Sequence, residues 1–132
     1  MNWSGRNVLI TGGAGHIGSH LTAELVKKGA NVRIADNLWR GKREYLFDES
    51  GNPIIDFGKN FLELDLREMK NCEKAVSGMD TVFHLADVVA GIDFVFGNEA
   101  FVYRSNILIN SNMFQAAHKA KLEKLKKMIF FC

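Results

Sequence analysis

A glycine-rich segment near the amino terminus constrains the fold of this chain more than any other feature. Residues 10–21, ITGGAGHIGSHL, place four glycines between a short apolar run and a segment whose apolar residues recur at helical spacing. A second short apolar run over residues 31–35 follows and ends at Asp36. A strand, a glycine turn, a helix and a strand within about thirty residues form a βαβ unit, whose right-handed crossover makes the two strands parallel.

The same alternation continues along the chain and predicts an α/β layered fold with a parallel sheet. Residues 40–59 interrupt it as a surface excursion, with a turn at residues 49–53. Elsewhere, short apolar runs predict strands and longer periodic segments predict helices. We expect strands over residues 7–11, 31–35, 60–64, 81–86 and 128–131, and helices over residues 17–28 with Gly29 as the stop signal, 67–76 with Asp65 as its cap, and 100–121.

The glycines themselves indicate an anion site at the start of the first helix. A phosphate there accepts hydrogen bonds from backbone N–H groups and is favoured by the helix dipole, and a Cβ in the turn would hold it away. Gly13, Gly15 and Gly18 fit the pattern G-x-G-x-x-G, and Gly12, Gly15 and Gly18 fit the related G-x-x-G-x-x-G. Glycine clusters also occur in ordinary turns, but a preceding strand and a following helix make this one a dinucleotide-binding fingerprint.

Asp36 strengthens that interpretation because it ends the second strand, about twenty residues after the glycines. A carboxylate at this position can accept both hydroxyls of the adenine ribose and would repel a 2′-phosphate, which favours NAD over NADP. Four basic residues close by in sequence leave NADP open: Arg33, Arg40, Lys42 and Arg43. The alternative for Asp36 is a helix cap or turn cap.

Five short segments together resemble the extended short-chain dehydrogenase/reductases, and among them the NAD-dependent nucleotide-sugar epimerases and dehydratases. They run in the family's order over nearly the whole chain, as TGGAGHIGSHL (11–21), DNLWRG (36–41), LDL (64–66), FHLA (83–86) and YRSN (103–106). The resemblance implies a Rossmann-type doubly wound parallel sheet, here truncated at about the fifth strand, with residues 1–132 forming the NAD(P)-binding domain. It also implies cofactor contacts at the carboxyl ends of the strands.

The resemblance assigns those contacts residue by residue. The backbone at His16 and Ile17 would meet the pyrophosphate, beside the glycines Gly12, Gly15 and Gly18. The other implied contacts are Asp36 and Asn37 to the adenine ribose, Asp65 and Leu66 beside the adenine, Leu85 and Ala86 at the nicotinamide-side ribose and phosphates, and Asn106 supporting that floor.

The family's catalytic Tyr-x-x-x-Lys pair is absent from this sequence. Tyr45 is followed four residues later by Glu49, and Tyr103 by Ile107. We therefore expect no catalytic residue in this chain and little activity from it alone. We interpret it as the amino-terminal part of a longer enzyme that acts on a nucleotide sugar, or as a shortened product. The alternative function is a non-catalytic dinucleotide-binding or protein-interaction module.

Other candidate sites have simpler explanations. His16 and His20 have the spacing of a zinc-binding pair, but no third ligand is evident. His84 alternates with apolar residues and is expected to be a hydrogen-bonded core histidine. The lysines at 119, 121, 124, 126 and 127 suit a solvated helix end. The aromatic stretch 91–103 could be core, a subunit contact or a segment near substrate.

Composition limits the partners and the compartment. With 17 basic and 15 acidic residues the formal charge is only +2, which argues against nucleic acid or an anionic membrane as the main partner. Cys72 and Cys132 are isolated thiols, and no stretch has the length of a signal peptide or membrane span, so we expect a cytoplasmic protein. A fifth strand left as a sheet edge and a bare helix surface predict weak solubility or homo-oligomerisation.

Overall fold

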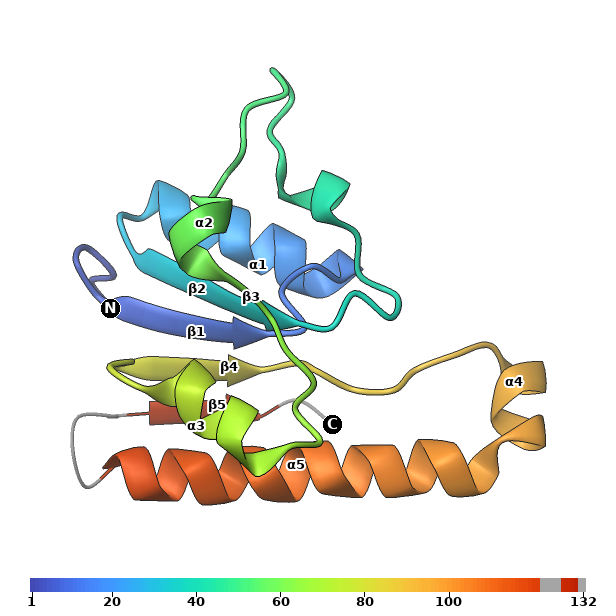
Figure 1. The fold of residues 1–132 in the computed structure, drawn as a ribbon. Helices are drawn as coiled ribbons and strands as arrows, with labels where there is room; N and C mark the ends of the chain where they lie inside the picture. Colours follow the sequence, from blue (N-terminus) through green and yellow to red (C-terminus); the bar gives the residue numbers. More distant parts are fainter. Residues whose placement is uncertain (122–126, 131–132) are drawn as a thin grey trace.

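The computed structural model describes residues 1–121 and 127–130, and its centre is a parallel sheet of five strands in the order β3-β2-β1-β4-β5 (Figure 1). This confirms the predicted α/β class with a doubly wound parallel sheet. The strands are β1 (Asn7–Thr11), β2 (Asn31–Asp36), β3 (Phe61–Glu63), β4 (Thr81–His84) and β5 (Lys127–Phe130).

The strand order reverses beside β1. The chain runs outward from β1 to β2 and β3, returns to place β4 on the other side of β1, and then adds β5. In register, Ile10 of β1 lies between Ile34 of β2 and Phe83 of β4. Because β1 and β4 send their connections in opposite directions, a crevice opens beyond their carboxyl ends, where open α/β sheets bind ligands.

Helices cover both faces of the sheet and divide the core in two. Helix α1 (His16–Lys27) packs on the face that carries Val8 and Ile10, whereas α3 (Met69–Val76) and α5 (Glu99–Lys121) cover the face that carries Leu9 and Val82 (Figure 1). Alternate residues of β1 therefore enter opposite cores, as the two-residue period of a strand requires. Each of these β1 side chains is fully buried, which explains the continuous apolar run in the sequence.

The first helix ends as the sequence predicts. Gly29 takes a positive φ of 82°, and its N–H donates to the carbonyl of Val26. The next N–H, of Ala30, reaches back to the carbonyl of Leu25. This pair of bonds satisfies carbonyls that the last helical turn leaves open, and it turns the chain into β2.

Several boundaries differ from the expectation. Helix α3 begins at Met69 and its N-cap residue is Glu68, so the prediction of Asp65 as the cap is wrong. Strand β3 begins one residue late because a short helix, α2 (Phe57–Asn60), occupies Asn60 and is capped by Asp56. Strand β4 ends at His84, two residues early. Phe131, expected in the fifth strand, lies outside the described residues.

Two further short elements were not predicted from the sequence. The turn η1 (Arg43–Leu46) interrupts the surface excursion, and α4 (Ile92–Gly97) precedes the long helix α5. None of the helices in the described part of the chain combines the length and apolar character that a membrane span requires.

Candidate functional site

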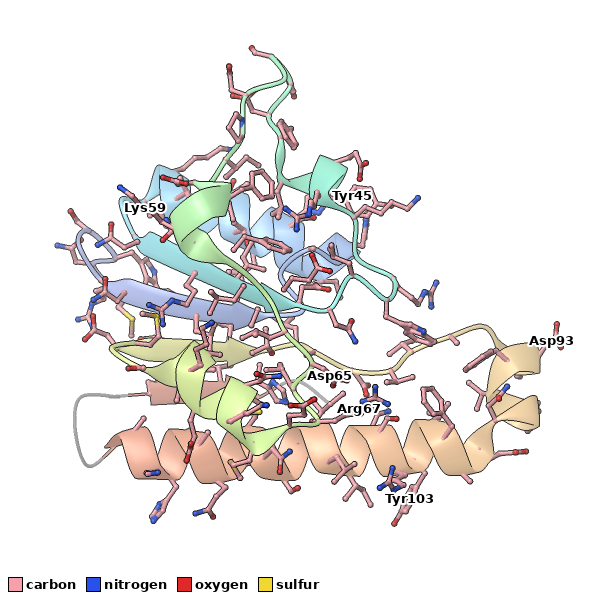
Figure 2. The ribbon with its side chains drawn as sticks, in the orientation of Figure 1. Tyr45, Lys59, Asp65, Arg67, Asp93 and Tyr103 are labelled. Carbon is pink, nitrogen blue, oxygen red and sulfur yellow. The ribbon has the colours of Figure 1, made fainter. Side chains whose placement is uncertain are left out.

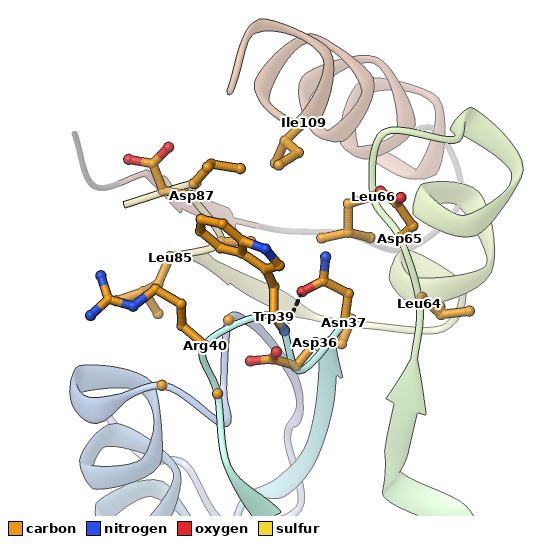
Figure 3. Close-up of a pocket in the computed structure, with 16 residues that line it drawn as sticks. Asp36, Asn37, Trp39, Arg40, Leu64, Asp65, Leu66, Leu85, Asp87 and Ile109 are labelled. Atoms are coloured by element: carbon orange, nitrogen blue, oxygen red, sulfur yellow. Dashed lines mark hydrogen bonds between the residues drawn. The ribbon is translucent and has the colours of Figure 1, made fainter. Parts of the chain in front are cut away.

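A cleft of about 140 Å³ lies at the carboxyl ends of β1, β2 and β4, where the strand order reverses (Figure 3). Its walls come from the glycine turn after β1, the loop after β2, the segment after β3 and the loop after β4. The structure brings eight of the residues expected at a cofactor site together around it: Gly12, Gly15, Asp36, Asn37, Asp65, Leu66, Leu85 and Ala86.

Close packing against backbone or side-chain atoms explains three of the four glycines in the turn. Gly12 has a positive φ of 68°, and a Cβ there would lie 3.0 Å from the backbone nitrogen of Ala86. A Cβ at Gly13 would lie 2.7 Å from a side-chain atom of Ile34, and one at Gly18 would overlap the carbonyl oxygen of Gly12. Gly15 differs, because it lines the cleft and its Cβ would meet only the Gly12 oxygen, at 3.2 Å.

The amino terminus of α1 stands beside this turn without a side-chain cap. Gly15 is the N-cap residue, and no acidic residue lies in the first helical turn. The positive end of the helix dipole is therefore not neutralised from within the helix, which is the condition an anion site requires. His16 and Ile17 are exposed at the helix start and lie outside the cleft lining, and Gly18 is buried beneath them.

Asp36 acts as a turn cap and also faces the cleft. Its side chain lines the cleft, and its carboxylate accepts hydrogen bonds from the backbone N–H groups of Ala14 at 3.0 Å and Leu38 at 2.8 Å. Burial raises the pKa of Asp36, the two backbone donors act in the opposite direction, and Glu63 raises it further. Leu38 has a positive φ of 57°, a strained conformation for a leucine, in the loop that the carboxylate holds.

The four basic residues that are close to Asp36 in sequence each interact with a different partner. Arg33 donates to the carbonyl oxygens of Ala75 and Ser77 at the end of α3. Arg43 pairs with Glu63 at 2.8 Å. Arg40 alone of the four lines the cleft, where its guanidinium donates to the carbonyl of Val89 at 2.6 Å. Lys42 lies over the ring of Tyr45, with 5.9 Å between Nζ and the ring centre.

Asp65 lies at the cleft with its carboxylate already paired. The guanidinium of Arg67 binds it as a fork, with Nη2–Oδ2 and Nε–Oδ1 distances of 2.7 and 3.0 Å (Figure 2). This hydrogen bonding holds the pKa of Asp65 below its ordinary value. Asp65 lies three residues before the N-cap residue of α3, Glu68, and therefore does not cap that helix.

The loop after β4 forms the floor of the cleft, and α5 supports it from behind. Asn106 accepts from the N–H of Val88 at 2.7 Å and donates to its carbonyl at 3.2 Å. Asn106 therefore does not line the cleft but holds the loop that does.

Trp39 and several of its neighbours in the cleft were not assigned a role from the sequence. The indole of Trp39 occupies the middle of the cleft region in Figure 3, and its ring centre lies 5.7 Å from Phe94 and 6.4 Å from Phe101. The DNLWRG segment was the available signal, since Trp39, Arg40 and Gly41 follow Asp36 within it. The other unassigned cleft residues are Ala35, Leu64, Asp87, Val88 and Ile109. Within the aromatic stretch 91–103, Phe94 and Phe101 thus pack against Trp39, whereas Phe96 is 69% exposed.

The two tyrosines and Cys72 lie away from the cleft, whose charged lining side chains are Asp36, Asp65, Asp87 and Arg40. Tyr45 is on η1 and Tyr103 on the outer side of α5 (Figure 2), and neither lines the cleft. Cys72 is fully buried, and burial raises the pKa of its thiol to about 12, so it stays protonated at neutral pH.

His20, His84 and Lys119 are bonded to other parts of the protein outside the cleft lining. His20 makes a hydrogen bond of 2.7 Å with the carbonyl of His16, and within residues 1–121 and 127–130 no three His, Cys, Asp or Glu side chains gather as a metal site would need. His84 is buried in the core, as expected. Lys119 pairs with Glu73 at 2.8 Å; Lys124 and Lys126 lie outside the described residues.

Comparison with known proteins identifies a family and several similar enzymes. Residues 8–131 match the model of the NAD dependent epimerase/dehydratase family. A UDP-N-acetyl-alpha-D-glucosaminuronate decarboxylase of Bacillus cytotoxicus is 38% identical over 126 residues, which cover 95% of this chain and 36% of the relative. A GDP-mannose 3,5-epimerase of Oryza sativa subsp. japonica is 34% identical over 83% of this chain and 27% of its own length.

Solved structures show the same architecture. The UDP-glucose 4-epimerase of Thermotoga maritima with UDP-glucose superposes with a TM-score of 0.75 at 31% identity, over 94% of this chain and 37% of the other. The UDP-glucose 4-epimerase of Thermus thermophilus, in complex with NAD, superposes with a TM-score of 0.70 at 33% identity, over 90% of this chain and 36% of the other. The chain thus spans about a third of the length of the proteins it resembles.

Proposed function

The chain belongs to the NAD-dependent epimerase/dehydratase family, and from this premise we propose that it binds NAD in the cleft beyond β1, β2 and β4. It would serve as the dinucleotide-binding portion of an enzyme that acts on a nucleotide-activated sugar. The observation that carries the proposal is one cleft bordered by an uncapped helix start, a glycine without a side chain and a buried carboxylate.

Each part of the cleft suits a different part of the dinucleotide. The diphosphate needs N–H donors and positive potential, which the start of α1 at His16 and Ile17 offers beside the bare backbone of Gly15. The ribose hydroxyls of the adenosine half need an acceptor, and Asp36 keeps its carboxylate at the cleft. Apolar Leu66 and Leu85 line the walls for the flat rings.

The same geometry supports NAD over NADP. A 2′-phosphate would face the buried carboxylate of Asp36, and two anions in a poorly solvated site repel each other strongly. Arg33 and Arg43 are bonded to α3 and to Glu63 instead of facing the ribose position. Only Arg40 reaches the cleft wall, and its guanidinium is bonded to Val89.

NAD supplies reversible hydride acceptance when it is bound, and the protein supplies binding and orientation. In this chain the residues position the dinucleotide: α1 and Gly15 hold the diphosphate, Asp36 holds a ribose, and the floor at Leu85 and Ala86 limits how deep the ligand sits. The sequence holds no Tyr-x-x-x-Lys pair for the proton-transfer step. We propose that the rest of the enzyme supplies that pair.

Titration calorimetry with NAD and with NADP tests the proposal. We expect the protein to bind NAD at least about tenfold more tightly than NADP, because one unfavourable charge contact of about 1.4 kcal/mol gives that ratio. Asp36→Asn should weaken NAD about tenfold or more and reduce the preference over NADP, since hydrogen bonds to a charged acceptor are the stronger ones.

Asp93→Asn is the matched control, because it makes the same chemical change at an exposed position on α4 (Figure 2). It should leave both affinities unchanged. A protein that binds neither dinucleotide, or an Asp36→Asn variant with wild-type affinity for NAD, would refute the proposal.

A further inference from the structure

The last residues of β1 and β4 are joined by polar side chains that the proposed cofactor contacts do not use. Thr11 and His84 are the buried ends of these strands, with 0% and 1% exposure. The Thr11 hydroxyl oxygen lies 2.6 Å from Nδ1 of His84, and Nε2 of the same ring lies 3.0 Å from Oδ1 of Asn110 on α5. A hydrogen-bonded chain therefore runs from α5 through β4 to β1.

The backbone at the cleft floor fixes the direction of the hydrogen bonds that join Thr11, His84 and Asn110. The Thr11 hydroxyl oxygen lies 3.1 Å from the N–H of Leu85 and 3.1 Å from that of Ala86. Backbone N–H groups only donate, so both lone pairs of the hydroxyl are occupied and its single hydrogen must point to His84 Nδ1. Nδ1 is then an acceptor, and in a neutral ring the hydrogen sits on Nε2 and faces Asn110.

The backbone of Leu85 and Ala86 is in direct contact with the glycine turn after β1. The Leu85 N–H is shared between the carbonyl and the hydroxyl of Thr11, whereas the Ala86 N–H goes to the hydroxyl. Gly12 approaches this backbone so closely that a Cβ would lie 3.0 Å from the Ala86 nitrogen. A displacement of Ala86 would therefore alter the contact with Gly12 and the shape of the cleft together.

We propose that Asn110, His84 and Thr11 act as positioning residues, which hold the Leu85–Ala86 backbone in the geometry that accepts the dinucleotide and do so only while the imidazole is neutral. The identity of the ligand in this inference rests on the proposed NAD function. The hydrogen bonding among Thr11, His84 and Asn110 does not depend on it. A proton added at Nδ1 would turn the acceptor into a donor aimed at a hydroxyl that has no lone pair left. The Ala86 N–H would then lose its acceptor or the imidazolium would lack one.

The surroundings of His84 favour the neutral ring. Burial lowers the pKa of His84, and the bond to Asn110 and the negative charge of Asp87 oppose that change. Asp87, in the loop after β4, is a charged group that acts on the ring, and the hydrogen-bond partners Thr11 on β1 and Asn110 on α5 are uncharged. Because the folded pKa lies below the ordinary value of 6.5, the neutral ring stabilises the fold fully above that pH, and this contribution is lost as pH falls toward the lowered pKa.

The first test measures the tautomer and protonation state of the His84 ring. In ¹⁵N NMR spectra of the protein at pH 7.5, we expect an unprotonated Nδ1 and a protonated Nε2 for His84. The opposite tautomer, or an imidazolium at that pH, would overturn the proposal. On acidification, amide exchange at Ala86 should accelerate in step with protonation of His84, and an Ala86 amide that stays protected after the ring is charged would also overturn it.

The second test removes the hydroxyl. Thr11→Val keeps the shape of the side chain but leaves the Ala86 N–H without its acceptor, so we expect Ala86 exchange to accelerate about tenfold or more and NAD affinity to fall about tenfold. Thr11→Ser restores a hydroxyl and should return both values to within about threefold of wild type. Equal effects from the two variants would show that only packing matters and would refute the positioning role.

Thr22→Val is the matched control. It removes another fully buried threonine hydroxyl, which bonds to the Gly18 carbonyl at 2.8 Å, without touching the cleft floor. It should leave Ala86 exchange unchanged.

If Thr11→Val does not fold, Asn110→Ala removes the hydrogen-bond partner on the other side of His84 and should also accelerate Ala86 exchange. Unchanged exchange would refute the proposal. If the wild-type protein binds no NAD, the proposed function fails, but ring protonation and Ala86 exchange still decide this inference.

Discussion

The glycines of the turn after β1 differ in how crowded a Cβ at each would be, and this separates those that close packing requires from Gly15, which lines the cleft and is the least crowded of the four. Gly12 and Gly18 are in contact with backbone, and Gly13 is in contact with Ile34. Gly15 has an extended conformation, with φ of −77°, that any residue adopts. Its missing side chain therefore leaves room in the cleft, and a Cβ there would require only a small shift of the Gly12 carbonyl.

This difference predicts opposite outcomes for two substitutions. Gly15→Val should keep the fold but place a branched side chain in the cleft, so NAD binding should be lost in titration calorimetry while urea unfolding changes little. Gly18→Ala should instead lower the free energy of unfolding by about 1–3 kcal/mol, because its Cβ would overlap Gly12 and lie 2.7 Å from Gly13 Cα.

Gly97→Ala provides the control, since a Cβ at Gly97 meets nothing within 4 Å. It should leave both binding and stability close to wild type. A Gly15→Val variant that binds NAD normally would show that the diphosphate does not lie against this turn.

At the scale of the elements, continuous apolar runs predicted the strands and a helical period predicted the long helices, because burial on both faces or on one face generates these two patterns. The four fully buried residues of β1 and the stripe of Ile109, Met113, Ala116 and Ala117 on α5 could be read directly. The short elements η1, α2 and α4 have four to six residues, too few to show a helical period. Asp56 before α2 was a usable cap signal, because its side chain accepts from Gly58 and Lys59.

One link between elements makes a stability prediction. Arg33 of β2 donates to the carbonyls of Ala75 and Ser77, at 3.0 and 2.8 Å, and so closes the end of α3. Arg33→Met keeps much of the apolar stem but removes both bonds, and we expect it to lower the free energy of unfolding by about 1–2 kcal/mol in urea titrations. Arg104→Met, an exposed change on α5, should cost less than about 0.5 kcal/mol. Equal stability of the two variants would contradict the role of Arg33.

At the scale of the whole molecule, the position of the cleft followed from strand order, but its detailed lining did not. Parallel strands bring the ends of β1, β2 and β4 together, so the sequence pattern alone was enough to place Gly15, Asp36 and Ala86 at one edge of the sheet. Trp39 could not be placed in this way, because its contacts with Phe94 and Phe101 join segments more than fifty residues apart in the sequence. Asn106 was expected to support the floor from the following helix, and the structure shows it bonded to the backbone of Val88.

The outer surface of α4 and α5 predicts that the 132-residue chain associates in solution. Ile92, Phe96 and Tyr103 are about 70% exposed, at 68, 69 and 71%, and Ile107 is 47% exposed. β5 also lies at an edge of the sheet. Exposed apolar patches and open sheet edges both favour contact with another copy of the chain.

Sedimentation velocity should therefore show a weight-average mass that rises with protein concentration. The double variant Phe96→Gln, Ile107→Gln should reduce this rise, since it removes two of the exposed apolar side chains. Phe47→Gln makes a similar change on the surface excursion, away from α4 and α5, and should not reduce it. A monomer at every concentration, with a single sharp thermal transition, would show that the apolar surface of α4 and α5 does not need a partner.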